Sequence, residues 1–138
     1  PVQAPDGVTL PAPVDYPIEL IVGPEVVTGS TRMKAGTATK LVLNMITTTT
    51  MVQLGKVWGN LMVDLLAANG KLRDRAIRIL CSQGTIDRPT AGRLLDEAGG
   101  RVKVALVMAR LRISAEQAQQ KIDEHDDRLR PLLGPPRN

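Results

Sequence analysis

The chain reads Gly23-Pro-Glu-Val-Val-Thr-Gly-Ser-Thr-Arg-Met-Lys-Ala-Gly-Thr37 at the point where its organisation is clearest. Just before this stretch lies Ile18-Glu-Leu-Ile-Val22, a short run rich in β-branched residues that is typical of a strand. A Gly-Pro turn and several small polar residues follow, and they lead into a region with helical spacing. The stretch therefore predicts a short strand at residues 18–22, then a turn, then the start of a long helix.

A long helix is predicted from Thr31 to about Leu54. Its apolar residues recur at helical spacing, and they are Met33, Leu41, Val42, Met45, Ile46 and Val52. Because this apolar stripe is broad, we expect the helix to be buried on more than one side. The threonines of residues 47–50 lower helix propensity, but their hydroxyls can bond to carbonyls one turn earlier. We therefore expect the helix to continue through them.

The middle of the chain predicts a turn followed by a second helix. Gly55 and Gly59 bracket the turn, and residues 60–66 fit a helix or an extended segment. Asn69 can cap a helix over residues 70–83 with its side-chain oxygen. The inner face of this helix is predicted to consist of Leu72, Ala76, Ile79 and Leu80.

Residues 85–133 have the pattern of a small three-helix module. The first helix opens at Pro89 or Thr90 and stops at a pair of glycines. Ser114 followed by Gln117 is a capping-box pattern that opens the third helix. The second helix lies between them, and its apolar residues at helical spacing are Val104, Val107, Met108 and Leu111.

The composition favours packed helices and a small anionic ligand over nucleic acid. The chain has 138 residues, 43% of them apolar, no Phe, and Trp58 and Tyr16 as its only aromatic residues. A core of aliphatic side chains favours helix packing over a β-sandwich. The net charge is +4, but the basic residues are interleaved with acids. Since aromatic side chains that could stack on bases are missing, we expect no nucleic-acid partner.

The sequence offers no pattern for a disulfide, a metal site or a membrane span. Cys81 is the only cysteine and fits a small buried hydrophobe better than a nucleophile. His125 lies among charged residues, where we expect a solvated side chain, and one histidine does not supply a metal site. We therefore expect no metal, no cofactor and no membrane partner. With no recognisable signal peptide, the prediction is a cytoplasmic protein.

The start of the predicted long helix has the features of an anion-binding site. The first turn of a helix presents unpaired N–H groups and the positive end of its dipole. Gly29 allows close approach to the backbone, Ser30 and Thr31 offer hydroxyls, and Arg32 and Lys34 add positive charge. The same residues also fit an ordinary helix cap with solvated cations beside it. From the residues alone, both interpretations stay open.

Several motifs resemble one bacterial enzyme family. These are GPEVVTGSTRMKAGTATK at residues 23–40, the following LVLNM, LGKVWGNLMVDL at residues 54–65, and DEAGGRVKVALVM. They are similar to sequences of the N-acetylmuramic acid 6-phosphate etherases and of their relative, the glucokinase regulatory protein. The resemblance extends from about Tyr16 to Leu133.

The resemblance implies a fold and a reaction. Members of the family carry a sugar-isomerase (SIS) domain, a parallel-sheet α/β fold that binds phosphosugars, followed by a helical region. The etherase removes D-lactate from the phosphorylated amino sugar N-acetylmuramic acid 6-phosphate during cell-wall recycling. The reaction is an elimination followed by addition of water, and the family uses glutamates as acid and base. The resemblance implies no cofactor.

The resemblance also implies that this chain holds only part of such an enzyme. The family's catalytic glutamates and most of its SIS sheet precede the segment that the chain matches, so we expect no activity from the chain alone. The predicted fold is mainly α, with one short strand and a long helix from the end of the SIS domain, then the three-helix module. The predicted domains are a Pro-rich extended tail (1–17), the SIS remnant (18–84), the helical module (85–133) and a tail (134–138).

Glu25 is a candidate acid or base, because related SIS isomerases carry a glutamate shortly before a Ser-Thr-Lys helix start. The alternative is a glutamate that satisfies turn amides or a subunit contact. In the first functional hypothesis, Ser30, Thr31, Arg32 and Lys34 line the phosphosugar site of a lyase fragment. The second is a phosphosugar sensor without catalysis, and the third is a helical dimerisation module. A homo-oligomer is expected, since SIS domains commonly pair.

Overall fold

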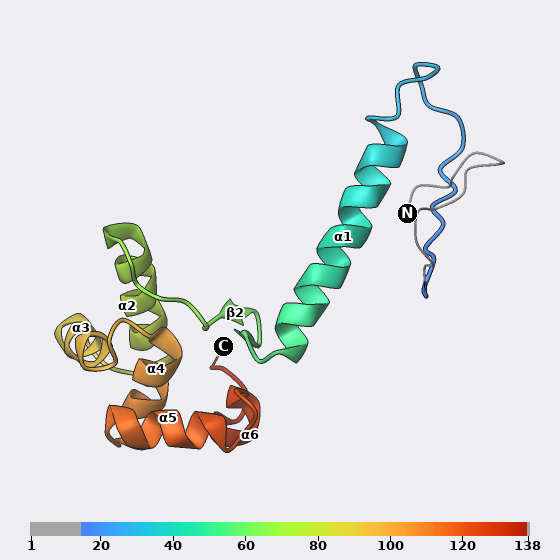
Figure 1. The fold of residues 1–138 in the computed structure, drawn as a ribbon. Helices are drawn as coiled ribbons and strands as arrows, with labels where there is room; N and C mark the ends of the chain where they lie inside the picture. The colour runs from blue at the N-terminus through green and yellow to red at the C-terminus, as the bar shows by residue number, and fades with distance from the viewer. Residues whose placement is uncertain (1–14, 138) are drawn as a thin grey trace. The chain divides into compact units, whose positions relative to one another are not determined.

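The computed structural model describes residues 15–137, and its contacts divide the chain into two compact units, Pro1–Thr49 and Thr50–Asn138. Helices predominate in the described residues, which confirms the mainly α fold (Figure 1). The elements in chain order are α1 (Lys34–Gln53), β1 (Val57–Trp58), β2 (Leu61–Met62), α2 (Gly70–Gly84), α3 (Arg88–Glu97), α4 (Val102–Leu111), α5 (Ala115–Asp123) and α6 (Leu129–Leu133). Most of the predicted N-terminal tail, residues 1–14, lies outside the described part of the chain.

The strand predicted at residues 18–22 does not form. The backbone there has no regular secondary structure, and the side chain of Ile21 is 81% exposed. A strand is stabilised by pairing with a neighbour, and the described residues supply none to this segment. The prediction of a strand was therefore wrong, because β propensity alone does not form a strand that has no neighbour to pair with.

Helix α1 is continuous but exposed. It begins at Lys34, later than predicted, and continues through the threonine run as expected. There the Thr47 hydroxyl donates to the Leu43 carbonyl at 2.9 Å, the predicted bond to the preceding turn. The expectation of burial on several sides is wrong, because no residue of α1 is buried and Leu41 is 52% exposed. The apolar side chains are present, but the described residues do not cover them.

The second unit opens with a small antiparallel hairpin. Strand β1 pairs with β2 in the register that sets Trp58 opposite Leu61, so residues 60–66 form no helix and contain β2. The Trp58 side chain is only 2% exposed and belongs to the core. Gly55 precedes the hairpin with φ of +71°, and a Cβ there would lie 2.4 Å from the Asp127 carbonyl oxygen. Only glycine fits this close approach.

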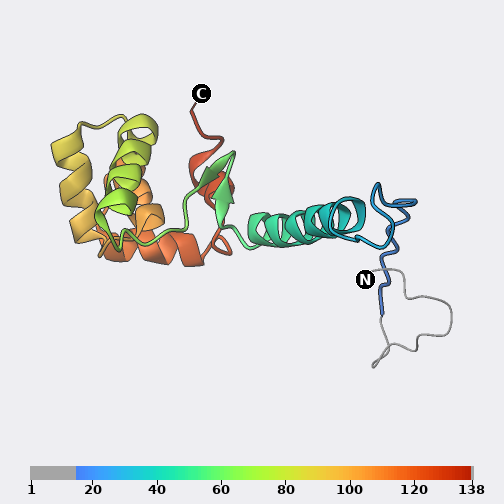
Figure 2. The same cartoon turned by 90° about the horizontal axis from the view of Figure 1, so that it is seen from above.

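Four helices build the core of this unit around α4. Helix α4 contacts α2, α3 and α5, and Figure 2 shows the bundle that these helices form. Seven of the ten residues of α4, Val102 to Met108, are buried. The predicted inner face of α2 is confirmed at Ala76, Ile79 and Leu80, which are buried, whereas Leu72 is half-buried. Because α2 contacts both α3 and α4, it shares one core with the helical module. The domain limits drawn from sequence at residues 17, 84 and 133 concern a longer protein and stay a prediction.

Helices α2 and α5 begin at the side-chain caps that the sequence predicts. Asn69 accepts a hydrogen bond from the Leu72 amide at 2.9 Å at the start of α2. At the start of α5, the side chains of Ser114 and Gln117 each accept from the other residue's backbone amide, a complete capping box. Helix α6 was not predicted, because the module ending at residue 133 was given only three helices. Proline is tolerated there, since it lies in the first turn, where amides have no helical partner.

Candidate functional site

The amides at the start of α1 are held by the chain's own Glu25. Its Oε2 accepts from the Lys34 amide and its Oε1 from the Ala35 amide, each at 3.0 Å. The hydrogen bonds from Ala35 and then Lys34 hold the pKa of Glu25 below its usual value. The expectation that these amides are free to bind an anion is therefore wrong. The alternative considered from sequence, a glutamate that satisfies amides of the turn, describes the geometry.

A tight reversal of the chain allows Glu25 to reach an amide nine residues ahead. Gly23 and Gly29 both have positive φ, at +68° and +82°, which glycine adopts without strain. The Ser30 amide donates to the Val27 carbonyl at 3.0 Å and closes a turn that contains Gly29. The loop thus folds back over the beginning of α1 and places the carboxylate where the helix dipole is positive.

The four predicted site residues do not converge on one hollow. Ser30 is half-buried, whereas Thr31, Arg32 and Lys34 are exposed. The Lys34 ammonium donates to the Pro24 carbonyl at 2.8 Å, so it is directed back to the loop. No hydrogen bond or ion pair of the Arg32 side chain is seen among the described residues. Whether these residues bind a phosphosugar stays a prediction.

Thr31 lines a hollow of about 480 Å³ along one face of α1. Its other lining residues include Gly36, Thr39, Lys40 and Asn44. Gly36 has no side chain and Thr39 has a short one, so both leave room for this hollow, and Lys40 supplies a cation beside it. The sequence reasoning missed Lys40 and Asn44. Gly36, Lys40 and Asn44 follow one another at intervals of four residues, a signal that could have placed them on one face of the helix.

A second polar cluster lies in the other unit, around the buried Lys103. The ammonium of this lysine is 2.9 Å from an Asp127 carboxylate oxygen and 3.0 Å from the Asp127 carbonyl. Lys56 adds an ion pair with Asp64 at 2.5 Å and another with Asp127 at 3.5 Å. The hydrogen bond to Asp64 raises the pKa of Lys56. Burial raises the pKa of Asp127, but the bonds and charges of Lys103 and Lys56 outweigh it and lower the pKa overall.

This cluster borders a hollow of about 330 Å³ that Asp64, Arg101 and Gln119 also line. Sequence reasoning did not single out Lys103. The available signal was its position in the apolar run VKVALVM, where a charge has no solvated face to occupy. Since a buried charge needs a partner, acidic side chains were to be expected nearby.

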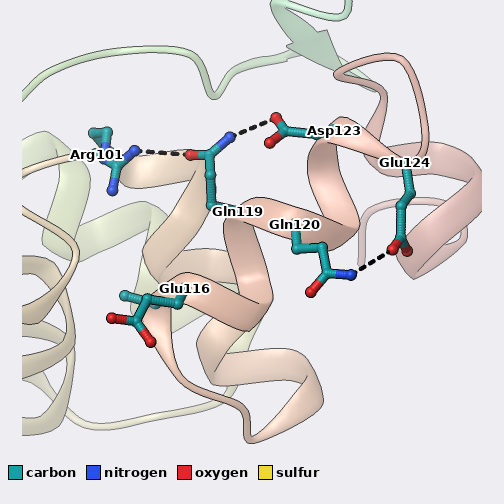
Figure 3. A pocket seen from close by; sticks show the side chains of 7 residues that line it. Arg101, Glu116, Gln119, Gln120, Asp123 and Glu124 are labelled. Carbon is teal, nitrogen blue, oxygen red and sulfur yellow. Dashed lines mark hydrogen bonds between the residues drawn. The ribbon is translucent and has the colours of Figure 1, made fainter.

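Another hollow, of about 690 Å³, lies over the polar face of α5. Figure 3 shows most of its polar side chains bonded to one another. Arg101 donates to Gln119 at 2.8 Å, Gln119 to Asp123 at 2.7 Å, and Gln120 to Glu124 at 2.9 Å. Since these bonds join neighbouring residues of the surface, the hollow has the character of an ordinary helix surface.

Cys81 and His125 have structural surroundings. Cys81 is partly buried against the core, as its hydrophobic interpretation predicts. His125 is half-buried rather than fully solvated, with Nδ1 at 2.8 Å from the Lys121 carbonyl oxygen. Across residues 15–137, no three metal-ligating side chains gather in one place. Within the same residues, no helix combines the length and apolar character needed to span a bilayer.

Comparison with known proteins gives strong similarity to one set of enzymes. A relative from Synechococcus sp. (strain CC9605), named N-acetylmuramic acid 6-phosphate etherase, is 54% identical over 123 residues, which cover 89% of this chain. Relatives with the same name from Parasynechococcus marenigrum (strain WH8102) and Prochlorococcus marinus (strain MIT 9313) are 53% and 52% identical over 87% and 90% of the chain. No model of a protein family matches the chain.

The match covers only part of these relatives. The chain spans 39%, 38% and 39% of the length of the three enzymes, respectively. Identity of about half over nearly all of this chain exceeds what a shared fold alone explains. By sequence, the chain therefore corresponds to the C-terminal part of the N-acetylmuramic acid 6-phosphate etherases.

Proposed function

We propose that this chain contributes part of the phosphosugar site of an N-acetylmuramic acid 6-phosphate etherase, a lyase that releases D-lactate. The observation that carries the proposal is the similarity to the etherases. A match of 123 residues in a chain of 138 must include the loop from Gly23 to Lys34. The predicted binding residues thus lie within the region that the chain shares with these enzymes.

The cap made by Glu25 changes how a phosphate is expected to bind. Because the Lys34 and Ala35 amides are occupied, the phosphate contacts would come from side chains instead. Arg32 is exposed, and a guanidinium can hold two phosphate oxygens at once. Ser30 and Thr31 offer hydroxyl donors, and Lys34 retains donors beyond the one bonded to Pro24. Positioning and neutralising the phosphate is the role proposed for these residues.

Glu25 fits a positioning role better than acid catalysis. A lowered pKa keeps its carboxylate ionised at neutral pH, so it has no proton to donate. As a base it would first have to release the two amides of α1. We therefore propose that Glu25 orders the loop that carries Ser30 to Lys34, while the acid and base come from the part of the enzyme that this chain lacks.

A chimera tests the proposed function. In it, residues 16–133 replace the matching region of the Synechococcus relative, and D-lactate release from N-acetylmuramic acid 6-phosphate is measured. We expect turnover, and we expect Arg32→Ala to lower kcat/KM at least about tenfold through the lost phosphate contact. The matched control is Arg75→Ala, an exposed arginine on α2. A folded chimera without lactate release, or an Arg32→Ala variant equal to the control, contradicts the proposal.

The helical dimerisation module stays a candidate, and the exposure of α1 favours it. Large apolar side chains along this helix are about half exposed, including Leu41, Leu43, Met45 and Ile46. A helix that is apolar on all sides is normally covered. Sedimentation of the 138-residue chain separates the candidates, since a pure association module forms oligomers that phosphosugar does not affect.

A further inference from the structure

The end of the described chain is held by the side chain of a buried glutamine. Gln83 lies on α2 and is only 6% exposed. Its Nε2 donates to the Arg137 carbonyl at 3.2 Å, and its Oε1 accepts from the Arg137 amide at 2.8 Å. One side chain thus binds both backbone groups of one residue, as a neighbouring strand does in a sheet.

Two more side chains bind backbone carbonyls at the start of this segment and just before it. The Trp58 indole donates from Nε1 to the Gly134 carbonyl at 2.8 Å. Arg110 donates to the Leu133 carbonyl and to the Gln83 carbonyl, each at 3.2 Å, and its guanidinium carbon lies 5.9 Å from the centre of a Trp58 ring. These residues come from β1, α2 and α4, so three separate elements hold one short segment.

The surface under the segment also has a shape that accepts proline. A Cβ on Gly59 would lie 2.4 Å from Cγ of Pro136, so the proline ring occupies space that only glycine leaves. Pro135 and Pro136 restrict φ and favour an extended backbone. At the far end of the segment, the Arg137 guanidinium contacts the Thr85 hydroxyl.

Side chains, rather than a backbone ladder, hold this segment in place. The Gly134 amide donates to the Arg130 carbonyl, which ends α6. Beyond it, among the described residues, Pro135 to Arg137 have no hydrogen bond from backbone to backbone. An extended peptide of the same sequence could therefore make the same contacts without being part of the chain.

We propose that Trp58, Gly59 and Gln83 form a peptide-binding groove, with the Arg110 guanidinium over the Trp58 ring. Its ligand is an extended Gly-Pro-Pro-Arg segment, supplied in this chain by residues 134–137. The hydrogen bonds to backbone groups provide affinity for an extended peptide, and the space over Gly59 selects proline at the third position. None of the groove residues belongs to the proposed phosphosugar site.

A peptide titration tests the groove. A chain ending at Leu133 is titrated with the peptide Gly-Pro-Pro-Arg-Asn, which corresponds to residues 134–138, and is followed by NMR. We expect saturable one-to-one shifts of the indole N–H of Trp58, the only tryptophan, and of the Gln83 side-chain amide. Gln83→Leu should weaken binding at least about tenfold. A scrambled peptide of equal composition is the control, and a folded chain that shows no specific shifts overturns the proposal.

The full chain provides a test that does not depend on folding of the shortened one. In Gln83→Leu we expect the Arg137 amide to exchange with solvent at least about tenfold faster, while amides of α5 exchange as before. Ser82→Ala, an exposed neighbour on the same helix, is the matched control. Unchanged Arg137 exchange in Gln83→Leu overturns the proposal. So does a dimer that disappears when residues 134–138 are removed, since the segment would then be supplied by a second copy.

Discussion

Helices α1 and α4 are both rich in apolar residues, yet they are stabilised in different ways. Seven residues of α4 are buried among α2, α3 and α5, and its stability comes from that burial. No residue of α1 is buried, although it is twice as long. Helix α1 is seen to be held by its backbone hydrogen bonds, by the bond from the Thr47 hydroxyl to the Leu43 carbonyl, and by the Glu25 cap. An apolar sequence therefore indicates that other residues must pack on the helix, but it does not show which residues those are.

The largest effect expected from this comparison is a difference between two leucines. Leu106 in α4 is fully buried, so Leu106→Ala should lower the free energy of unfolding by about 2–5 kcal/mol. Leu41 in α1 is half exposed, so Leu41→Ala should change it by less than about 0.5 kcal/mol. Urea unfolding followed by circular dichroism measures both. Similar losses for the two variants would mean that α1 is covered in solution and would remove the contrast.

An intermediate effect is expected at the charge cluster of the second unit. Asp127→Asn keeps a residue that tolerates the observed φ of +64° but removes the charge beside Lys103, so we expect a loss of about 1–3 kcal/mol. The pKa of Asp127 is lowered in the folded state. Its contribution is therefore complete above the unfolded pKa, about 3.9, and is lost as pH falls through the folded pKa.

Urea midpoints measured between about pH 2 and pH 7 check this prediction. The wild-type midpoint should fall more steeply than that of Asp127→Asn as the pH drops below about 4. Asp126→Asn, a neighbouring exposed acid that also has positive φ, is the matched control and should keep the wild-type slope. Parallel profiles for wild type and Asp127→Asn would show that the carboxylate does not stabilise Lys103.

The smallest effect is local and concerns the cap of α1. Glu25→Gln leaves one carbonyl oxygen for two amides, so we expect faster hydrogen exchange at Lys34 or Ala35 and no change in the second unit. In the wild type, the shifts of these two amides should titrate with a midpoint below the usual glutamate value of about 4.3, because the folded pKa is lowered. Glu19→Gln, an exposed glutamate earlier in the chain, is the control. A normal midpoint would mean that the cap does not persist in solution.

Sequence reasoning succeeded where the interaction spans a few residues. The caps at Asn69 and Ser114 each bond to an amide three residues ahead, so the pattern of residue types is sufficient to find them. It failed at residues 18–22, because a strand requires a partner that local pattern cannot supply. It also left open whether an anion or Glu25 occupies the amides of α1, since nothing in the spacing shows that Glu25 turns back to them.

The order of residues along this chain was enough to reveal its helical character, most helix starts and its kinship with the etherases. All of these features depend on short-range hydrogen bonding or on the residue types themselves. Folding in three dimensions settled which carboxylate meets Lys103, what occupies the mouth of α1, and where Arg137 is held. Each of those contacts joins residues separated by between nine and 54 positions. Such pairs form only when loops and packed helices bring distant segments together, because chain connectivity by itself does not hold them near one another.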